Sequence, residues 1–110
     1  MSNSIQTPAF ICEMDKLEKN LKLIDEIQKQ SGVKILLALK GFALSETFVL
    51  MGKYLYGASA SSLNEARLSY DKFAKETHTY LPAYRENEIE QIAQISDTLI
   101  FNSLSQFKRF

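Results

Sequence analysis

Lys34-Ile-Leu-Leu-Ala-Leu-Lys40 is the stretch on which the interpretation of the whole sequence depends. Its five consecutive apolar residues follow a glycine turn at Gly32 and predict a short strand that is buried on both faces. A lysine at the end of such a strand is costly unless its ammonium group is paired or chemically modified. Removal from water favours the neutral, nucleophilic amine, so Lys40 is a candidate for Schiff-base formation with a carbonyl cofactor. The alternative is a structural lysine whose stem covers the core while its ammonium group reaches water.

Length and charge exclude several classes of protein. The 110-residue chain is one domain at most. It carries 13 Lys and Arg against 13 Asp and Glu, without a basic run, so neither a nucleic acid nor a membrane is expected as a partner. No apolar run approaches the roughly 18 residues of a membrane span. The start of the chain lacks the features of a secretion signal, and the lone Cys12 is expected to be a buried thiol, so we expect a cytoplasmic location.

Strand-like and helical segments alternate along the chain. Strands are expected at residues 34–40, 56–60, 78–82 and 98–102. Gly32 should end the first helix. The expected capping pairs of three helices are Asp15 with Glu18, Ser62 with Glu65, and Ser103 with Gln106. The helical side chains expected to face inward include Leu17, Leu21, Ile24, Ile27, Phe48, Val49, Ala66, Tyr70, Phe73, Ile89, Ile92, Ala93, Phe107 and Phe110.

This regular alternation predicts an α/β fold with parallel strands and right-handed crossovers. An open doubly wound sheet usually binds its ligand through a glycine-rich first turn, and this sequence has none. The even repeat favours a (β/α)8 barrel, which needs about twice as many strands as the sequence supplies. We therefore expect four βα units that form the first half of a barrel.

Barrel chemistry takes place at the carboxyl ends of the strands. The residues expected there are Lys40, Ser59, Ser61, Ser62, Pro82, Tyr84, Asn102 and Ser103. Helix capping already accounts for Ser62 and Ser103. His78 is expected to begin a strand at the opposite end, where a structural role is the better interpretation. The sequence offers no metal-ligand spacing and no Ser/His/Asp set.

Four segments carry a resemblance to a known family: Ala38-Leu-Lys40, Ala60-Ser-Ser-Leu-Asn-Glu65, Tyr80-Leu-Pro-Ala-Tyr-Arg-Glu-Asn-Glu-Ile89 and Phe101-Asn-Ser-Leu-Ser-Gln106. They resemble the first units of the pyridoxal-phosphate enzymes of the alanine-racemase and ornithine-decarboxylase type, known as fold type III. Many members have Ala-Asn after the lysine, whereas this chain has Gly41-Phe42. Together with the Pro-Ala-Tyr segment, this points within the family to the decarboxylases that act on carboxynorspermidine or carboxyspermidine.

The resemblance implies a role for each part of the chain. Lys40 would hold pyridoxal 5′-phosphate, and Ser59 would occupy the position at which relatives carry a cofactor-binding aspartate. Residues 1–110 would be the N-terminal part of the barrel, without its C-terminal half and a β-domain, and such a part alone is expected to be inactive. The expected substrate is a polyamine carboxylate, converted to norspermidine or spermidine, and the expected assembly is a homodimer. The alternatives are a non-decarboxylating pyridoxal-phosphate-binding barrel and a diaminopimelate- or ornithine-type decarboxylase.

Overall fold

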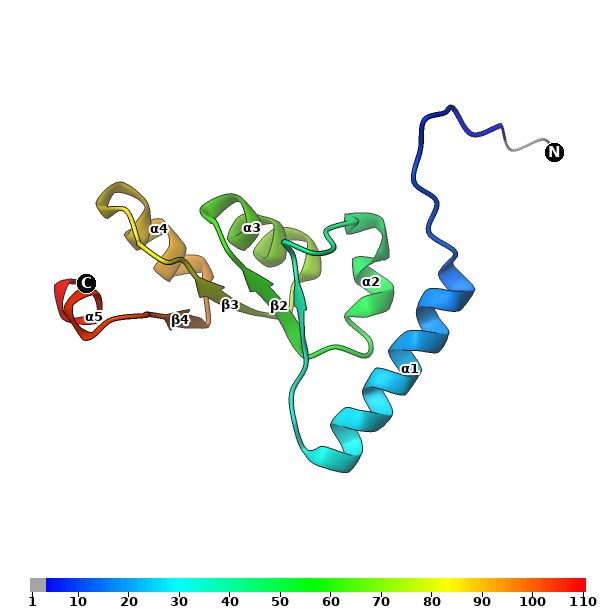
Figure 1. The fold of residues 1–110 in the computed structure, drawn as a ribbon, viewed down its shortest axis with the longest axis horizontal. Coiled ribbons are helices and arrows are strands. Elements are labelled where there is room, and N and C mark those ends of the chain that lie inside the picture. The colour runs from blue at the N-terminus through cyan, green and yellow to red at the C-terminus, as the bar shows by residue number, and fades with distance from the viewer. Residues whose placement is uncertain (1–3) are drawn as a thin grey trace.

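The structure, a computed structural model, describes residues 4–110 (Figure 1). It alternates helices and short strands along the whole described chain. In chain order the elements are α1 (Met14–Ser31), β1 (Leu36–Ala38), η1 (Ser45–Thr47), α2 (Phe48–Met51), β2 (Gly57–Ala60), α3 (Leu63–Leu68), η2 (Ser69–Phe73), β3 (Glu76–Tyr80), α4 (Glu86–Ile95), β4 (Thr98–Ile100) and α5 (Leu104–Arg109). The expected α/β class is confirmed.

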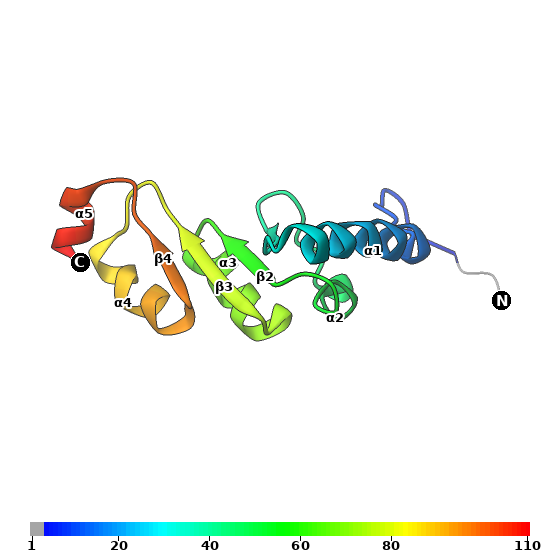
Figure 2. The same ribbon diagram turned by 90° about the horizontal axis from the view of Figure 1, so that it is seen from below.

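The four strands form one parallel sheet in the order β1-β2-β3-β4. Figure 1 shows α2, α3 and α4 along one side of the strands, and the turned view in Figure 2 shows the strands following one another across the molecule. Within residues 4–110 no helix covers the other side of β2, β3 and β4. We call this side the open face; it carries Ser59, Glu76, His78 and Tyr80. The assignment follows from alternation along the strands, because the residues between them are buried against the helices.

The helix side of the sheet contains the core. Phe48 and Phe73 meet edge to face, with ring centroids 5.2 Å apart. Around them pack the buried residues Leu21, Leu39, Met51, Leu55 and Ala58. Between η2 and β3, the buried hydroxyls of Ser69 and Thr77 are hydrogen-bonded at 2.6 Å, so these polar groups are satisfied without water.

The strand expected at residues 34–40 is shorter and less buried than the sequence predicts. Only Leu36–Ala38 form β1, although the ladder continues to Leu39, whose N–H donates to the Ser59 carbonyl at 3.1 Å. The prediction that both faces are buried is wrong for the described chain, because Leu37 packs against the core while Ala38 is exposed on the uncovered side. β1 is also an edge strand here, with β2 as its one neighbour among the described residues.

Helix ends agree with the sequence where the cap is local. Ser62 accepts the N–H of Glu65 at 3.1 Å, and Ser103 accepts the N–H of Gln106 at 3.2 Å, so both expected caps are confirmed. Gly32 ends α1 with a φ of 74°, the left-handed conformation that favours glycine. The prediction that Asp15 caps α1 is wrong, because Asp15 lies within the helix. α1 begins at Met14, and its N-cap residue, Glu13, makes no side-chain capping bond.

Six residues expected to face inward are exposed, among them Ile27, Phe107 and Phe110. Val49 is 78 % exposed and Tyr70 is 58 % exposed, and Ala93 is also exposed. Val49 lies on a helix of only four residues, of which Phe48 and Met51 face the core. At Tyr70 the reason is the wider π-helical turn η2, which turns Ser69 and Phe73 inward instead.

Strand boundaries also shift. β3 begins at Glu76 and ends at Tyr80, so His78 lies in the middle of the strand rather than at its start. β4 ends at Ile100, before the expected boundary at residue 102.

Cys12, expected to be buried, is partly exposed. Among the described residues, no helix is long and apolar enough to cross a membrane.

Gly57 at the start of β2 is required by close packing of the backbone. A Cβ at this position would lie 2.1 Å from the carbonyl oxygen of Glu76 on the neighbouring strand. Real Cβ atoms do not approach an oxygen so closely, so any side chain would force β2 and β3 apart. Glycine therefore sets the start of the β2–β3 ladder.

Candidate functional site

Lys40 follows the carboxyl end of β1 in a tight turn. The carbonyl of Ala38 accepts the N–H groups of Gly41 at 3.0 Å and Phe42 at 3.2 Å, which fixes the backbone on both sides of the lysine. Leu39 is buried in the core, whereas Lys40 is exposed. The desolvation expected from the sequence is therefore not supplied by residues 4–110. The amine is held on a fixed backbone at a strand end and can be reached from outside.

Ser59 lies in the middle of β2 on the open face. Its neighbours Ala58 and Ala60 are completely buried against the helices, which directs the Ser59 side chain to the other side of the sheet. In the ladder Ser59 pairs with Ala38 on β1 and with His78 on β3. Ser59 is thus two residues nearer the amino end of the sheet than Lys40, on the neighbouring strand.

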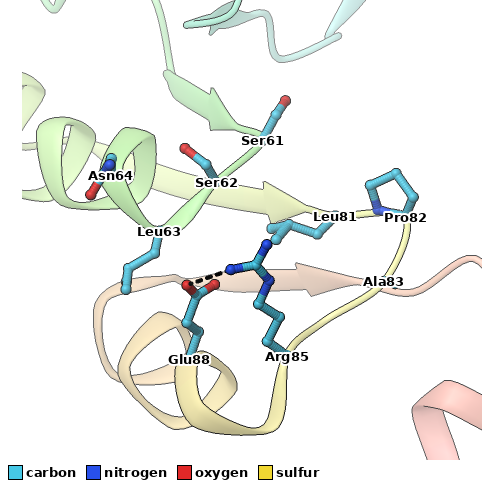
Figure 3. A pocket seen from close by; sticks show the side chains of 9 residues that line it. All are labelled: Ser61, Ser62, Leu63, Asn64, Leu81, Pro82, Ala83, Arg85 and Glu88. Carbon is cyan, nitrogen blue, oxygen red and sulfur yellow. Dashed lines mark ion pairs between the residues drawn. The ribbon is translucent and has the colours of Figure 1, made fainter.

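A cavity of about 350 Å³ opens at the carboxyl ends of β2 and β3 (Figure 3). One wall is the loop from β2 into α3, and the other is the loop from β3 into α4. Polar and charged side chains dominate it, and its lining residues are Ser61, Ser62, Leu63, Asn64, Leu81, Pro82, Ala83, Arg85 and Glu88. The structure therefore brings Ser61, Ser62 and Pro82 together as expected from the sequence. Lys40 and Ser59 do not line this cavity.

Two charged residues of this cavity were missed by sequence reasoning. Arg85 Nη1 and Glu88 Oε1 are 3.7 Å apart, which is an ion pair but longer than a hydrogen bond (Figure 3). Arg85 is the N-cap residue of α4, and Glu88 lies in its first turn. Their spacing of three residues places them on one side of the helix, a signal that the sequence did contain. The cavity thus holds both a cation and an anion that are loosely paired.

A chain of four polar side chains crosses the amino ends of the first three strands. Lys34 Nζ donates to the Tyr56 hydroxyl at 2.8 Å, and that hydroxyl donates to Glu76 Oε1 at 2.8 Å. The other carboxylate oxygen of Glu76 lies 2.8 Å from His78 Nε2. The hydrogen bonds from His78 and then Tyr56 hold the pKa of Glu76 below its ordinary value, and the bond to Tyr56 raises the pKa of Lys34. These contacts agree with the structural interpretation of His78.

No protein-family profile matches this chain. Among residues 4–110 there is also no group of three or more His, Cys, Asp and Glu side chains that could hold a metal ion.

The chain is similar to three decarboxylases that are named for carboxylated polyamines or a related compound. This similarity confirms the resemblance expected from the sequence. In particular, it is 50 % identical over 96 % of its length to the carboxynorspermidine/carboxyspermidine decarboxylase of Campylobacter jejuni, and 44 % identical over 96 % to the enzyme of that name from Herminiimonas arsenicoxydans. It is 41 % identical over 98 % of its length to a carboxyaminopropylagmatine decarboxylase of Synechocystis.

A solved structure supports the same relationship. The crystal structure of carboxynorspermidine decarboxylase from Campylobacter jejuni, complexed with norspermidine, matches 96 % of this chain with a TM-score of 0.93 and 50 % identity. The chain spans only 28–29 % of the length of the curated relatives. It also covers 29 % of the chain in the crystal structure.

Proposed function

We propose that this chain forms part of a decarboxylase that converts carboxynorspermidine to norspermidine and carboxyspermidine to spermidine. The observation that carries the proposal is the match to the norspermidine-bound enzyme, with a TM-score of 0.93 at 50 % identity. At this level of identity both the backbone and the side chains at strand ends are expected to be comparable. The role assigned is therefore the release of carbon dioxide from a small polyamine carboxylate, in polyamine synthesis.

The same proposal includes pyridoxal 5′-phosphate as the cofactor and Lys40 as the residue that holds it. The position of Lys40 fits this role, because its exposed amine follows the carboxyl end of a parallel strand on a backbone fixed by two hydrogen bonds to Ala38. When bound, pyridoxal phosphate supplies the electron sink that accepts the electrons released as carbon dioxide leaves. Lys40 would hold the cofactor through Nζ, which must be in its neutral form to act as a nucleophile. Ser59, on the neighbouring strand, would add a hydroxyl on the open face of the sheet.

We also propose that residues 1–110 form the N-terminal part of a (β/α)8 barrel. The four-stranded parallel sheet with helices on one side supports this, because a barrel has helices outside and a side-chain-filled interior. The open face would then line that interior. The C-terminal half of the barrel, a β-domain, a homodimeric assembly and a cytoplasmic location belong to the same proposal, and residues 1–110 alone would be inactive.

A second candidate substrate follows from the Synechocystis relative, which is named for carboxyaminopropylagmatine and is 41 % identical to this chain. Going by that name, its substrate ends in a guanidino group rather than an amine. The two candidates share the reacting carboxylate and differ in the tail, so they are separated by comparing specificity constants.

The test is turnover by the protein expressed from its complete reading frame and supplied with pyridoxal phosphate. Carbon dioxide release is measured with carboxynorspermidine, carboxyspermidine, carboxyaminopropylagmatine, diaminopimelate and ornithine. We expect the highest kcat/KM with one of the first two. Preference for diaminopimelate or ornithine would contradict the proposed substrate class, and cofactor binding without release of carbon dioxide would indicate a non-catalytic binding protein.

The role of Lys40 has its own test. Borohydride reduction in the presence of pyridoxal phosphate, followed by peptide mapping, should place the label on Lys40. Lys40→Ala should abolish both labelling and turnover, whereas Lys53→Ala, which removes another exposed lysine, should change neither. Label on Lys34 or Lys53 would refute the assignment.

A further inference from the structure

Gln106 connects two loops at the carboxyl ends of the strands. Its side-chain Oε1 accepts the backbone N–H of Tyr84 at 2.6 Å, and its Nε2 donates to the Pro82 carbonyl at 3.2 Å and to Asn102 Oδ1 at 3.1 Å. The orientation of the amide is determined by its surroundings, because an N–H can only donate and a carbonyl can only accept. One side chain therefore ties the loop from β3 into α4 to the loop from β4 into α5.

This use of Gln106, which follows β4, differs from that of its counterpart Glu65, which follows β2, two strands earlier in the sheet. Glu65 follows its capping serine by the same interval, and its carboxylate accepts the N–H of Ser61 within its own loop at 2.5 Å. Gln106 instead reaches across to residues 82–84. A glutamate could not make all three bonds of Gln106, because a carboxylate has no N–H to donate to the Pro82 carbonyl.

Tyr84 is held at its other end as well. Its ring is buried and lies 5.0 Å, between centroids, from the ring of Phe101. Its hydroxyl lies 2.9 Å from the carbonyl oxygens of both Thr79 and Ile100, on β3 and β4. Burial raises the pKa of this hydroxyl, so it stays protonated and able to donate at neutral pH. Tyr84 is thus fixed by its backbone to Gln106 and by its side chain to the sheet.

The loop that Gln106 fixes forms a wall of the cavity in Figure 3. Pro82, Ala83 and Arg85 line that cavity, together with Ser61 and Ser62 on the opposite wall, whereas Gln106 lies outside it. Arg85 and Glu88 present opposite charges there at a separation of 3.7 Å. The ammonium groups of a polyamine tail could pair with the Glu88 carboxylate, provided that the wall keeps its position.

We propose that Gln106 is a positioning residue, which holds residues 82–85 in place so that the cavity between the β2–α3 and β3–α4 loops can bind the ammonium-bearing tail of a polyamine. That this tail belongs to the carboxylated polyamine substrate rests on the proposed function, in which the carboxylate end reacts at Lys40, outside this cavity. Gln106 acts through the loop and does not touch the ligand. Its removal should weaken binding and leave the chemical step intact.

The test uses Gln106→Met, which keeps the length of the side chain and removes both the acceptor and the donors of its amide, and Gln106→Ala. Lys108→Ala, an exposed residue of the same helix, is the matched control. Amide hydrogen exchange at Tyr84, measured without cofactor or substrate, should become about tenfold faster in both Gln106 variants and stay unchanged in the control. Unchanged exchange in Gln106→Met and Gln106→Ala would overturn the positioning role. Gln106→Met keeps this result interpretable if Gln106→Ala fails to fold.

The second readout is steady-state kinetics on carboxynorspermidine. In both Gln106 variants, KM should rise about tenfold while kcat changes less than about twofold, the pattern of lost binding rather than lost chemistry. Faster exchange with unchanged KM would show that the cavity does not bind the substrate. It would overturn the proposed ligand of the cavity and leave the positioning role of Gln106. An inactive wild-type protein would refute the proposed function and the assigned ligand, while the exchange experiment would still decide the role of Gln106.

Discussion

Replacing Phe48 by alanine should be among the most destabilising single changes in the core. The Phe48 ring is 1 % exposed and meets Phe73 edge to face at 5.2 Å, so the substitution removes a fully buried ring and an aromatic pair. Substitutions of this kind cost about 3–5 kcal/mol, and the near-complete burial of Phe48 argues for about 4 kcal/mol. This is a large part of the roughly 5–15 kcal/mol that stabilises a typical domain.

The neighbouring residue supplies the control. Val49 lies on the same short helix but is 78 % exposed, so Val49→Ala should change the free energy of unfolding by less than about 0.5 kcal/mol. Urea unfolding followed by far-UV circular dichroism measures both variants. With a slope of about 1–3 kcal/mol per molar urea, Phe48→Ala should lower the midpoint by roughly 2 M. Equal effects of the two substitutions would refute the assigned orientation of α2.

Three further predictions concern the sheet and its caps. Gly57→Ala should destabilise the protein by about 1–3 kcal/mol or more, because the added Cβ would lie 2.1 Å from the Glu76 carbonyl oxygen; a thermal melt that matches wild type would contradict this. The pKa of Glu76 is held below its ordinary value of 4.5, chiefly by the hydrogen bond with His78, so its stabilising contribution is present above that value and is lost as the pH falls through the folded-state pKa. The stability difference between wild type and Glu76→Gln should accordingly shrink as the pH is lowered below 4.5 in urea titrations, and a difference that grows on acidification would show that the sign is wrong. Ser62→Ala should cost about 1 kcal/mol through loss of its bond to the Glu65 N–H, whereas Ser62→Asp should retain most of the stability; equal losses in both would argue against capping.

Much of the fold could be predicted from the sequence because the deciding interactions are local. Ser62 and Ser103 bond to N–H groups three residues away, and Gly32 adopts a backbone conformation that favours glycine. Such signals depend only on neighbours along the chain. The alternation of strands and helices was equally readable, and with it the parallel sheet. Lys40 was located at the end of the first strand on the same local grounds.

Side-chain orientation was less predictable where the helix departs from regular spacing. Tyr70 has the spacing of an inward residue in an α-helix, yet the π-helical turn η2 directs Ser69 inward, where its hydroxyl meets Thr77 on β3. The burial of β1 could not be predicted for a different reason. Whether Ala38 is covered depends on a second layer over the open face, and residues 4–110 supply none.

The clearest difference between sequence and structure lies in two chemically similar positions. Glu65 and Gln106 each follow a capping serine by three residues, and their local sequences predict the same role. Capping by both serines was determined by the sequence, because serine and N–H belong to the same helical turn. The partners of the two longer side chains were decided by tertiary structure. Glu65 bonds within its own loop, whereas Gln106 bonds across to Tyr84 and Pro82, because the packing of β3 beside β4 brings a donor and an acceptor of the neighbouring loop within its reach.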